Sequence, residues 1–219
     1  MTLPHFVPEE FKDALRDFAA TLKENFSSAL PANPEDQLKP PVQNLLRAVA
    51  ANVQTRSEAQ VEGLGARPDI GLTVRRLLCG FVELKAPGKG ARTSRFRGAD
   101  KKQWEKFKAL PNLLYTDGSE WALYRSGELQ SEVIRFSGDV TVDGTDAFDD
   151  EDVAGLHTLL IDFLNWQPVA PNSPQALAKL LAPLCRLLRE DVLVAASKPD
   201  SNLAQLAGEW RVYLFPEAG

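Results

Sequence analysis

Apolar residues recur every three or four positions along the first fifty residues, which predicts two amphipathic helices. The first is expected over residues 8–30, with an apolar face of Phe11, Leu15, Phe18, Ala19 and Leu22. Pro31 then interrupts the pattern, and Asn33 is placed to cap a second helix. That helix is expected to continue to about Val53, although Pro40-Pro41 must distort or restart it.

Short apolar runs replace the helical spacing further along the chain, and they predict β-strands. Three runs follow one another at Glu58–Val61, Ile70–Val74 and Leu77–Leu84. A helix is expected over residues 100–109. Three further strands are then expected at Leu113–Thr116, Trp121–Tyr124 and Glu132–Phe136. Together they are expected to form a β-meander. The predicted order is therefore helix, three strands, helix, strands.

Composition changes near Gly138, where an acidic stretch from Asp143 to Asp152 predicts a linker or an exposed loop. Only helical patterns follow it, over residues 152–166, 173–194 and 202–214, and Pro183 predicts a kink or break in the second. We therefore expect one domain over residues 1–140 and an all-α helical subdomain over residues 150–219. The apolar face of this subdomain is expected to pack partly against the first domain.

Composition excludes several classes of protein. The 219 residues suffice for one well-buried domain with a small appendage. No apolar run is long enough to span a membrane, and the first residues lack the pattern of a signal peptide. Cys79 and Cys185 lie far apart, and His5 and His157 have no partners at metal-ligand spacing. These features indicate a soluble cytoplasmic protein with reduced thiols and no membrane partner.

The net charge of −5 argues against nucleic acid as a partner, but its distribution argues the other way. A basic stretch follows the third predicted strand and contains Lys89, Arg92, Arg95, Arg97, Lys101 and Lys102. Such a stretch can guide a phosphate backbone toward an adjacent site. The alternative is an ordinary solvated loop and helix face.

The candidate chemistry lies in Asp69, Glu83 and Lys85. Alternate side chains of a strand project to opposite faces, so Glu83 and Lys85 share one face while Val82 and Leu84 share the other. An acid and a base inside a mostly apolar strand are costly to bury without a use. Two carboxylates that hold Mg²⁺, with a lysine supporting the attacking water, would provide that use. We expect Asp69 and Lys85 to be reachable by solvent.

The pattern Pro68-Asp69 followed by Glu83-x-Lys85 resembles the signature of the PD-(D/E)XK nucleases, the restriction-endonuclease-like superfamily. The resemblance implies an α/β fold with an αβββαβ core and a mixed sheet, with the acids and the lysine on two neighbouring strands. It also implies a Mg²⁺-dependent activity against DNA.

Further segments are similar to the amino-terminal nuclease region of type ISP and type IIG restriction-modification enzymes. These segments are Gly80–Gly88, Ala109–Gly118, Trp121–Arg125 and Glu209–Pro216. The resemblance implies a site-specific deoxyribonuclease that serves phage defence, and it leaves open whether cleavage needs a transient dimer on DNA or a translocating domain. It also implies methyltransferase and target-recognition domains elsewhere in a longer chain. No methylation motif is present here, so no methyltransferase activity is expected of these residues.

The resemblance suggests roles for two more residues. Gln103 corresponds to a glutamine that some branches follow four residues later with tyrosine, where this chain has Phe107. Gln103 would bind the water network or a phosphate, or it simply faces solvent. Glu35 corresponds to a helix carboxylate that supports the metal, although the helix dipole alone favours an acid there. Glu58 and Glu62 compete with Glu35 for this role.

The sequence therefore favours a Mg²⁺-dependent DNA endonuclease domain. The alternative is a DNA-binding or regulatory module with a nuclease-like fold and no cleavage activity. The complete Asp69, Glu83 and Lys85 set argues for the first. A purely structural interaction domain would leave the basic stretch unexplained.

Overall fold

The computed structural model describes residues 6–28, 33–50, 52–57, 67–75 and 77–167, together with isolated positions between 174 and 206. The chain divides into two compact units. One comprises Met1–Ala59 and Pro68–Pro168, and the other comprises Gln60–Arg67 and Val169–Gly219. Nearly all described residues belong to the first unit, whose fold is given below.

A seven-stranded sheet forms the centre of this unit, with strand order β1-β2-β3-β4-β5-β6 and β7 paired to β5. The strands are β1 (Val53–Ser57), β2 (Ile70–Val74), β3 (Leu77–Leu84), β4 (Leu113–Thr116), β5 (Glu120–Arg125), β6 (Glu128–Leu129) and β7 (Ile134–Arg135). β3 and β4 are parallel and the other pairs are antiparallel, so the sheet is mixed. Helix α3 (Gly98–Phe107) makes the crossover that a parallel pair requires.

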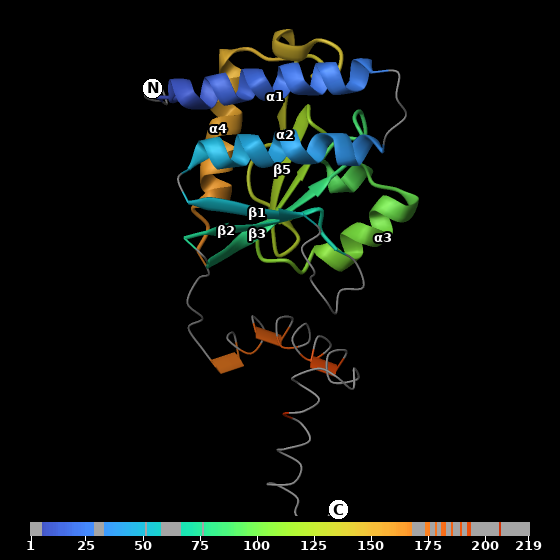
Figure 1. Cartoon of the computed structure of the whole chain (residues 1–219). Helices are drawn as coiled ribbons and strands as arrows, with labels where there is room; N and C mark the ends of the chain where they lie inside the picture. The colour runs from blue at the N-terminus through green and yellow to red at the C-terminus, as the bar shows by residue number, and fades with distance from the viewer. Residues whose placement is uncertain are drawn as a thin grey trace, which may run out of the picture. The chain divides into compact units, whose positions relative to one another are not determined.

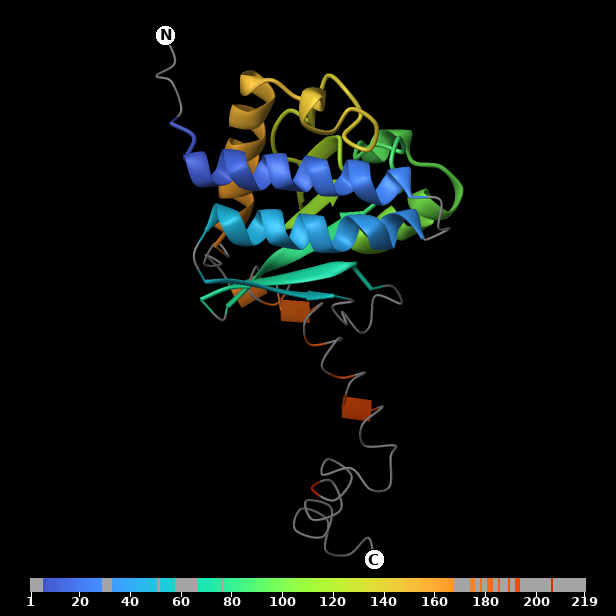
Figure 2. The same cartoon turned by 45° about the horizontal axis from the view of Figure 1, so that its top comes forward.

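Helices cover both faces of the sheet. Helices α1 (Glu9–Ser27) and α2 (Pro34–Val49) run side by side over one face, and α4 (Asp150–Leu164) joins them in the same apolar core (Figures 1 and 2). Val82 and Leu84 of β3 belong to this core. The opposite face carries Tyr115, whose ring contacts Trp104 of α3 at 6.0 Å between centroids. Burial on both faces explains why β4 and the later part of β3 are largely apolar.

Helix α2 is continuous through Pro40 and Pro41 and ends at Val49, so it does not restart as one expectation allowed. A proline at position 41 removes the N–H that would bond the Gln37 carbonyl. The Asn25 side chain of α1 donates to that carbonyl instead, at 3.4 Å. The Asn33 side chain accepts from Glu35 N and caps the helix, as the sequence predicted.

The first strand lies at Val53–Ser57, upstream of the predicted run. The predicted run Glu58–Val61 and the neighbouring Glu62 lie outside the described residues. The strands at 70–74, 77–84 and 113–116 have the predicted bounds, and β2 and β3 form the predicted hairpin. The last predicted strand, Glu132–Phe136, is shorter, because only Ile134–Arg135 of β7 pair with β5, and β6 was not predicted.

The acidic stretch before α4 keeps most of its acids exposed, as an exposed loop would, but it is a folded part of the first unit and not a linker. A 3₁₀ turn at Gly144–Ala147 buries both of its end residues and packs against α1. Asp149 and Asp152 form a capping box, and the acids of the first turn suit the positive end of α4. Helix α4 belongs to the same compact unit as the sheet, although the sequence placed a boundary near residue 150. Nearly all of the later predicted helices lie outside the described residues.

Close packing joins α4 to β3. A Cβ atom at Gly80 would lie 2.6 Å from the Asn112 carbonyl oxygen and 2.8 Å from the Phe163 ring, so only glycine fits there. The buried Asn112 amide donates to the Cys79 and Phe163 carbonyls at 3.1 and 2.9 Å. Within the described residues, no helix is long and apolar enough to cross a membrane.

Candidate functional site

The β2–β3 hairpin brings Asp69, Glu83 and Lys85 together. Asp69 immediately precedes β2, and the pairing of Ile70 with Val82 sets it beside the end of β3. Asp69 Oδ2 accepts a hydrogen bond from Leu84 N at 2.8 Å. Lys85 Nζ donates to Glu83 Oε1 at 3.1 Å. The two carboxylates and the ammonium therefore share one end of the hairpin, where Lys85 contacts Asp100 of α3 and Asp69 contacts Lys39 of α2.

Glu83 is deeply buried and incompletely bonded. Its side chain is 3% exposed, and its Oε2 atom has no hydrogen-bond partner among the described residues. Burial raises the pKa of Glu83 to about 8, the Asp69 carboxylate adds to this rise, and Lys85 opposes it. Burial also raises the pKa of Asp69, against the hydrogen bond from Leu84. The ionised form of Glu83 is thus poorly stabilised by its protein surroundings, which is the condition that a bound cation relieves.

Lys85 is enclosed, so the expectation that solvent reaches it is wrong. Its side chain is 3% exposed, and its ammonium contacts Glu83, the Gln103 Oε1 atom and, at 3.4 Å, Asp100 Oδ1. The ring of Phe96, from the loop after β3, and the ring of Tyr115, from β4, also lie about 6 Å from this ammonium. Asp69 is more accessible, with a side chain 22% exposed.

Gln103 faces this centre and not bulk solvent, because it contacts the Lys85 ammonium. Asp100, one turn earlier on α3, was not singled out from the sequence. Its carboxylate forms ion pairs with both Lys85 and Lys89: Oδ1 lies 3.4 Å from Lys85 Nζ, and Oδ2 lies 3.3 Å from Lys89 Nζ. The signal was available, since positions three apart on a helix share a face.

Helix α2 contributes Glu35 and Lys39. Glu35 Oε1 accepts a hydrogen bond from Ala86 N at 3.3 Å, and its charge raises the pKa of both Asp69 and Glu83. Lys39 Nζ lies 3.9 Å from Asp69 Oδ1, a contact that sequence reasoning missed. Helical spacing could have revealed it, because positions four apart lie on one face.

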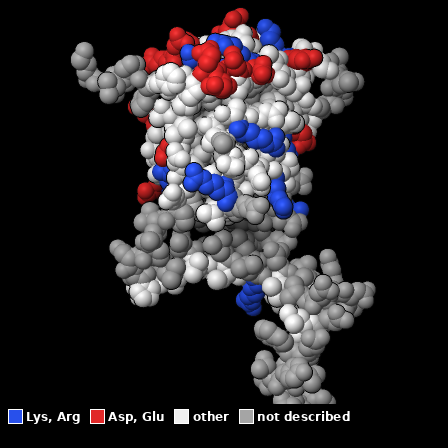
Figure 3. Space-filling model, turned by 60° about the vertical axis from the view of Figure 1, so that its left-hand side comes forward, with Lys and Arg blue, Asp and Glu red and all other residues white. Residues whose placement is uncertain are grey.

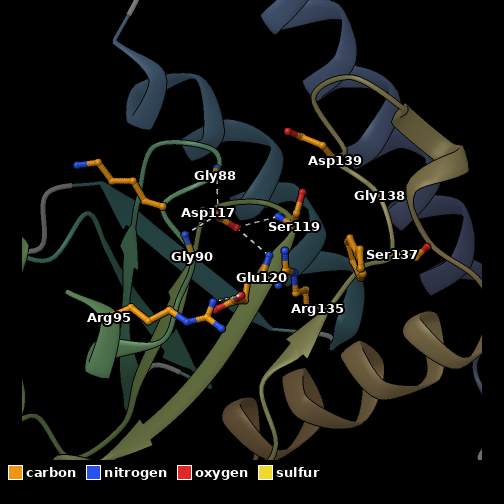
Figure 4. A pocket seen from close by; sticks show the side chains of 12 residues that line it. Gly88, Gly90, Arg95, Asp117, Ser119, Glu120, Arg135, Ser137, Gly138 and Asp139 are labelled. Atoms are coloured by element: carbon orange, nitrogen blue, oxygen red, sulfur yellow. Dashed lines mark hydrogen bonds and ion pairs between the residues drawn. The ribbon is translucent and has the colours of Figure 1, made fainter.

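Two buried acids of the β4–β5 turn hold the loop that follows β3 (Figure 4). Asp117 accepts hydrogen bonds from the backbone N–H groups of Gly88, Gly90, Ser119 and Glu120, at 2.7–3.1 Å. Glu120 Oε1 accepts from Ala91 N and Arg92 N at 3.0 and 3.2 Å. Burial raises the pKa of Asp117, and these hydrogen bonds oppose the rise. The sequence indicated only a turn at this point.

The predicted basic residues divide into two groups. Lys89, Arg92, Arg95 and Arg97 lie in the loop, where Lys89 pairs with Asp100, Arg95 with Glu120, and Arg97 with two carbonyls. Lys101 and Lys102 are exposed on α3. Acidic side chains gather elsewhere, at one end of the face in Figure 3. The first turns of α1 and α4 are both acidic and contribute no residue to the centre.

The residues fit a divalent cation held by two carboxylates. The part of the chain that the structure describes contains no group of three or more acids, histidines or cysteines that could hold a metal. Asp69 and Glu83 would therefore need main-chain oxygen and water to complete the six or more oxygen ligands of Mg²⁺. The unpartnered Glu83 Oε2 atom supports this fit. Glu35 accepts a hydrogen bond from Ala86 N, so binding the cation through a water molecule suits it better than direct ligation.

A scan against protein-family models and a search of curated proteins both gave no match. Among solved structures, a chain of a cryo-EM structure of a DrdV–DNA complex is similar to this chain at 19% identity and a TM-score of 0.49. The similarity covers 86% of this chain and 18% of that chain, so this chain spans about a fifth of its length. The order α2-β1-β2-β3-α3-β4 and the mixed sheet are the expected αβββαβ arrangement. The chain therefore has an α/β fold built on a mixed sheet.

Proposed function

We propose that this chain is a Mg²⁺-dependent DNA endonuclease domain of a restriction-modification enzyme, and that it hydrolyses phosphodiester bonds. One observation carries the proposal: Asp69, Glu83 and Lys85 meet at one end of the β2–β3 hairpin, and the buried Glu83 Oε2 atom has no partner there. The two carboxylates suit a divalent cation, and the ammonium beside them suits the negative charge of a phosphodiester.

Each residue has a distinct role in this proposal. Asp69 and Glu83 hold the cation, which when bound neutralises phosphate charge and activates water. Lys85 supplies positive charge beside the attacked phosphorus and orients the water. Gln103 and Asp100 keep the Lys85 ammonium in place. Lys39 stabilises the ionised form of Asp69.

The exposed cations near the centre are proposed to bind the DNA backbone. Arg92, Lys101 and Lys102 are exposed, and their contacts with phosphate would be salt-dependent and independent of sequence. Methyltransferase and target-recognition domains of a longer chain would then supply site recognition and modification.

One observation favours the alternative of a DNA-binding module that does not cleave. Lys85 is enclosed by three acceptors, and Glu83 has a pKa near 8, so a closed and neutral centre is stable at neutral pH. Cleavage requires this centre to admit a cation and a phosphate. The two functions differ in whether Mg²⁺ produces strand breaks.

A plasmid nicking assay distinguishes them. Supercoiled DNA is incubated with the protein in Mg²⁺, Ca²⁺ or EDTA, beside Lys85→Met and a surface control, Lys12→Met on α1. Methionine keeps most of the lysine volume, so the enclosed site stays packed. We expect Mg²⁺-dependent nicking by the parent and the Lys12 variant only. Binding without nicking in Mg²⁺ would favour the silent module.

A further inference from the structure

A hollow of about 320 Å³ lies beside the β4–β5 turn, at the end of the sheet where β4 ends and β5 begins (Figure 4). Three segments surround it: the loop Gly88–Gly90 with Arg95, the turn Asp117–Glu120, and residues 135–139. Ligand clefts in proteins begin at about 300 Å³, so the hollow is large enough for one nucleotide.

The acids that line the hollow already have partners within the protein. Asp117 and Glu120 are 3% and 4% exposed and accept the six backbone hydrogen bonds described above. Asp139 Oδ1 accepts from the N–H and the hydroxyl of Thr141, at 2.9 and 2.7 Å. These carboxylates fix the shape of the walls, and their charge is largely engaged by donors.

The cations that line the hollow are open to solvent. The side chains of Lys89 and Arg95 are 51% and 55% exposed. Arg135 on β7 is exposed and stands opposite Glu120 in the β5–β7 pair. Ser119 Oγ accepts from Val140 N at 3.1 Å, which leaves its O–H to donate. Two guanidinium groups, an ammonium and a hydroxyl are the donors that phosphate oxygens select.

The hollow is also connected to the candidate centre. Asp100 contacts Lys85 of the centre and Lys89 of the hollow at 3.4 and 3.3 Å. A single carboxylate therefore spans the two places. A DNA strand that sets one phosphate beside Lys85 would bring a neighbouring nucleotide to the hollow.

We propose that this hollow is a subsite for the nucleotide next to the cleaved phosphodiester bond, with its phosphate bound by Arg95, Arg135 and Lys89. The subsite deepens the nuclease function proposed above and rests on it. Arg135 is the residue that best tests it, because it lines the hollow and takes no part in the centre.

The test is binding of a fluorescent duplex of about 20 base pairs, measured in Ca²⁺ over a range of salt concentrations. Arg135→Ala should weaken binding roughly tenfold and lower the slope of log K against log[salt] by roughly 0.9. Arg135→Lys should recover part of the affinity, and Arg16→Ala on α1 should match the parent. Affinity and slope unchanged in Arg135→Ala would overturn the subsite.

Two further arms separate this proposal from the nuclease function. If the parent nicks plasmid but Arg135→Ala binds and nicks like the parent, the hollow is no subsite and the nuclease function stands. If the parent neither nicks nor binds the duplex, titration with thymidine monophosphate and with inorganic phosphate decides. If the parent binds the nucleotide and Arg135→Ala does not, the hollow is still an anion-binding site. If the parent binds neither probe, the proposed site is overturned.

Discussion

The charge state of Glu83 gives the sharpest prediction, because it links the buried site to a measurable stability. The pKa of Glu83 rises from 4.5 to about 8 in the folded protein. Each pH unit of such a rise corresponds to about 1.4 kcal/mol, so ionising Glu83 within the fold costs up to about 5 kcal/mol relative to the unfolded chain.

The sign follows from the proton count. Between about pH 4.5 and pH 8 the folded protein retains the Glu83 proton and the unfolded chain has lost it. The contribution of Glu83 is therefore fully present below pH 4.5 and is lost as the pH rises toward 8. Glu83→Gln cannot ionise, and Lys85 keeps Asp100 as a counter-charge, so the variant should escape this loss.

Urea and thermal unfolding in EDTA, from about pH 5 to about pH 9, measure the effect. The unfolding free energy of the parent should fall relative to Glu83→Gln by several kcal/mol, which is roughly 10 °C in Tm for a chain of this size. Mg²⁺ should restore the parent at high pH and leave the variant unchanged. The surface variant Glu128→Gln should follow the parent. A difference between parent and Glu83→Gln that stays constant over this pH range would refute the reasoning.

Three further predictions concern neighbouring parts of the structure. Gly80→Ala should cost about 2 kcal/mol or more in urea unfolding, because its Cβ would meet the Phe163 ring at 2.8 Å, and an unchanged midpoint would contradict that packing. Asp117→Asn should lose two of the four hydrogen bonds that its carboxylate accepts from backbone N–H groups and cost about 2–3 kcal/mol, with faster hydrogen exchange at Gly90. Asp100→Asn should lower the single-turnover nicking rate with little change in DNA affinity or Tm, whereas a parallel loss of affinity would assign Asp100 to binding.

The sequence predicted the β2–β3 hairpin and the bounds of β4 well, because their apolar runs are short and bounded by turn residues. Alternation along β3 was enough to place Glu83 and Lys85 on one face, opposite Val82 and Leu84. It did not show that this face is covered. The burial of Lys85 depends on the rings of Phe96 and Tyr115, which reach it from separate segments, and no local pattern encodes such a contact.

The acidic residues misled for a related reason. Composition treats an acid as a solvated group, yet Asp117 and Glu120 are buried where they satisfy backbone N–H groups of a distant loop. The acids before α4 were likewise predicted to form a linker or an exposed loop; most are exposed, but Asp149 and Asp152 cap the helix. Their partners are set by the tertiary fold or by the helix start, which composition alone does not distinguish from an exposed loop.

Single-turnover cleavage of supercoiled plasmid by an Asp69→Asn variant tests the central claim most directly. Asparagine keeps an oxygen for the hydrogen bond from Leu84 N but removes the charge that holds the cation. We predict Mg²⁺-dependent cleavage by the parent, none in EDTA, and a rate at least roughly 100-fold lower for the variant, with unchanged Tm at about pH 5. Equal rates for the two proteins, or parent cleavage that persists in EDTA, would contradict the assignment of Asp69, Glu83 and Lys85 as the nuclease centre.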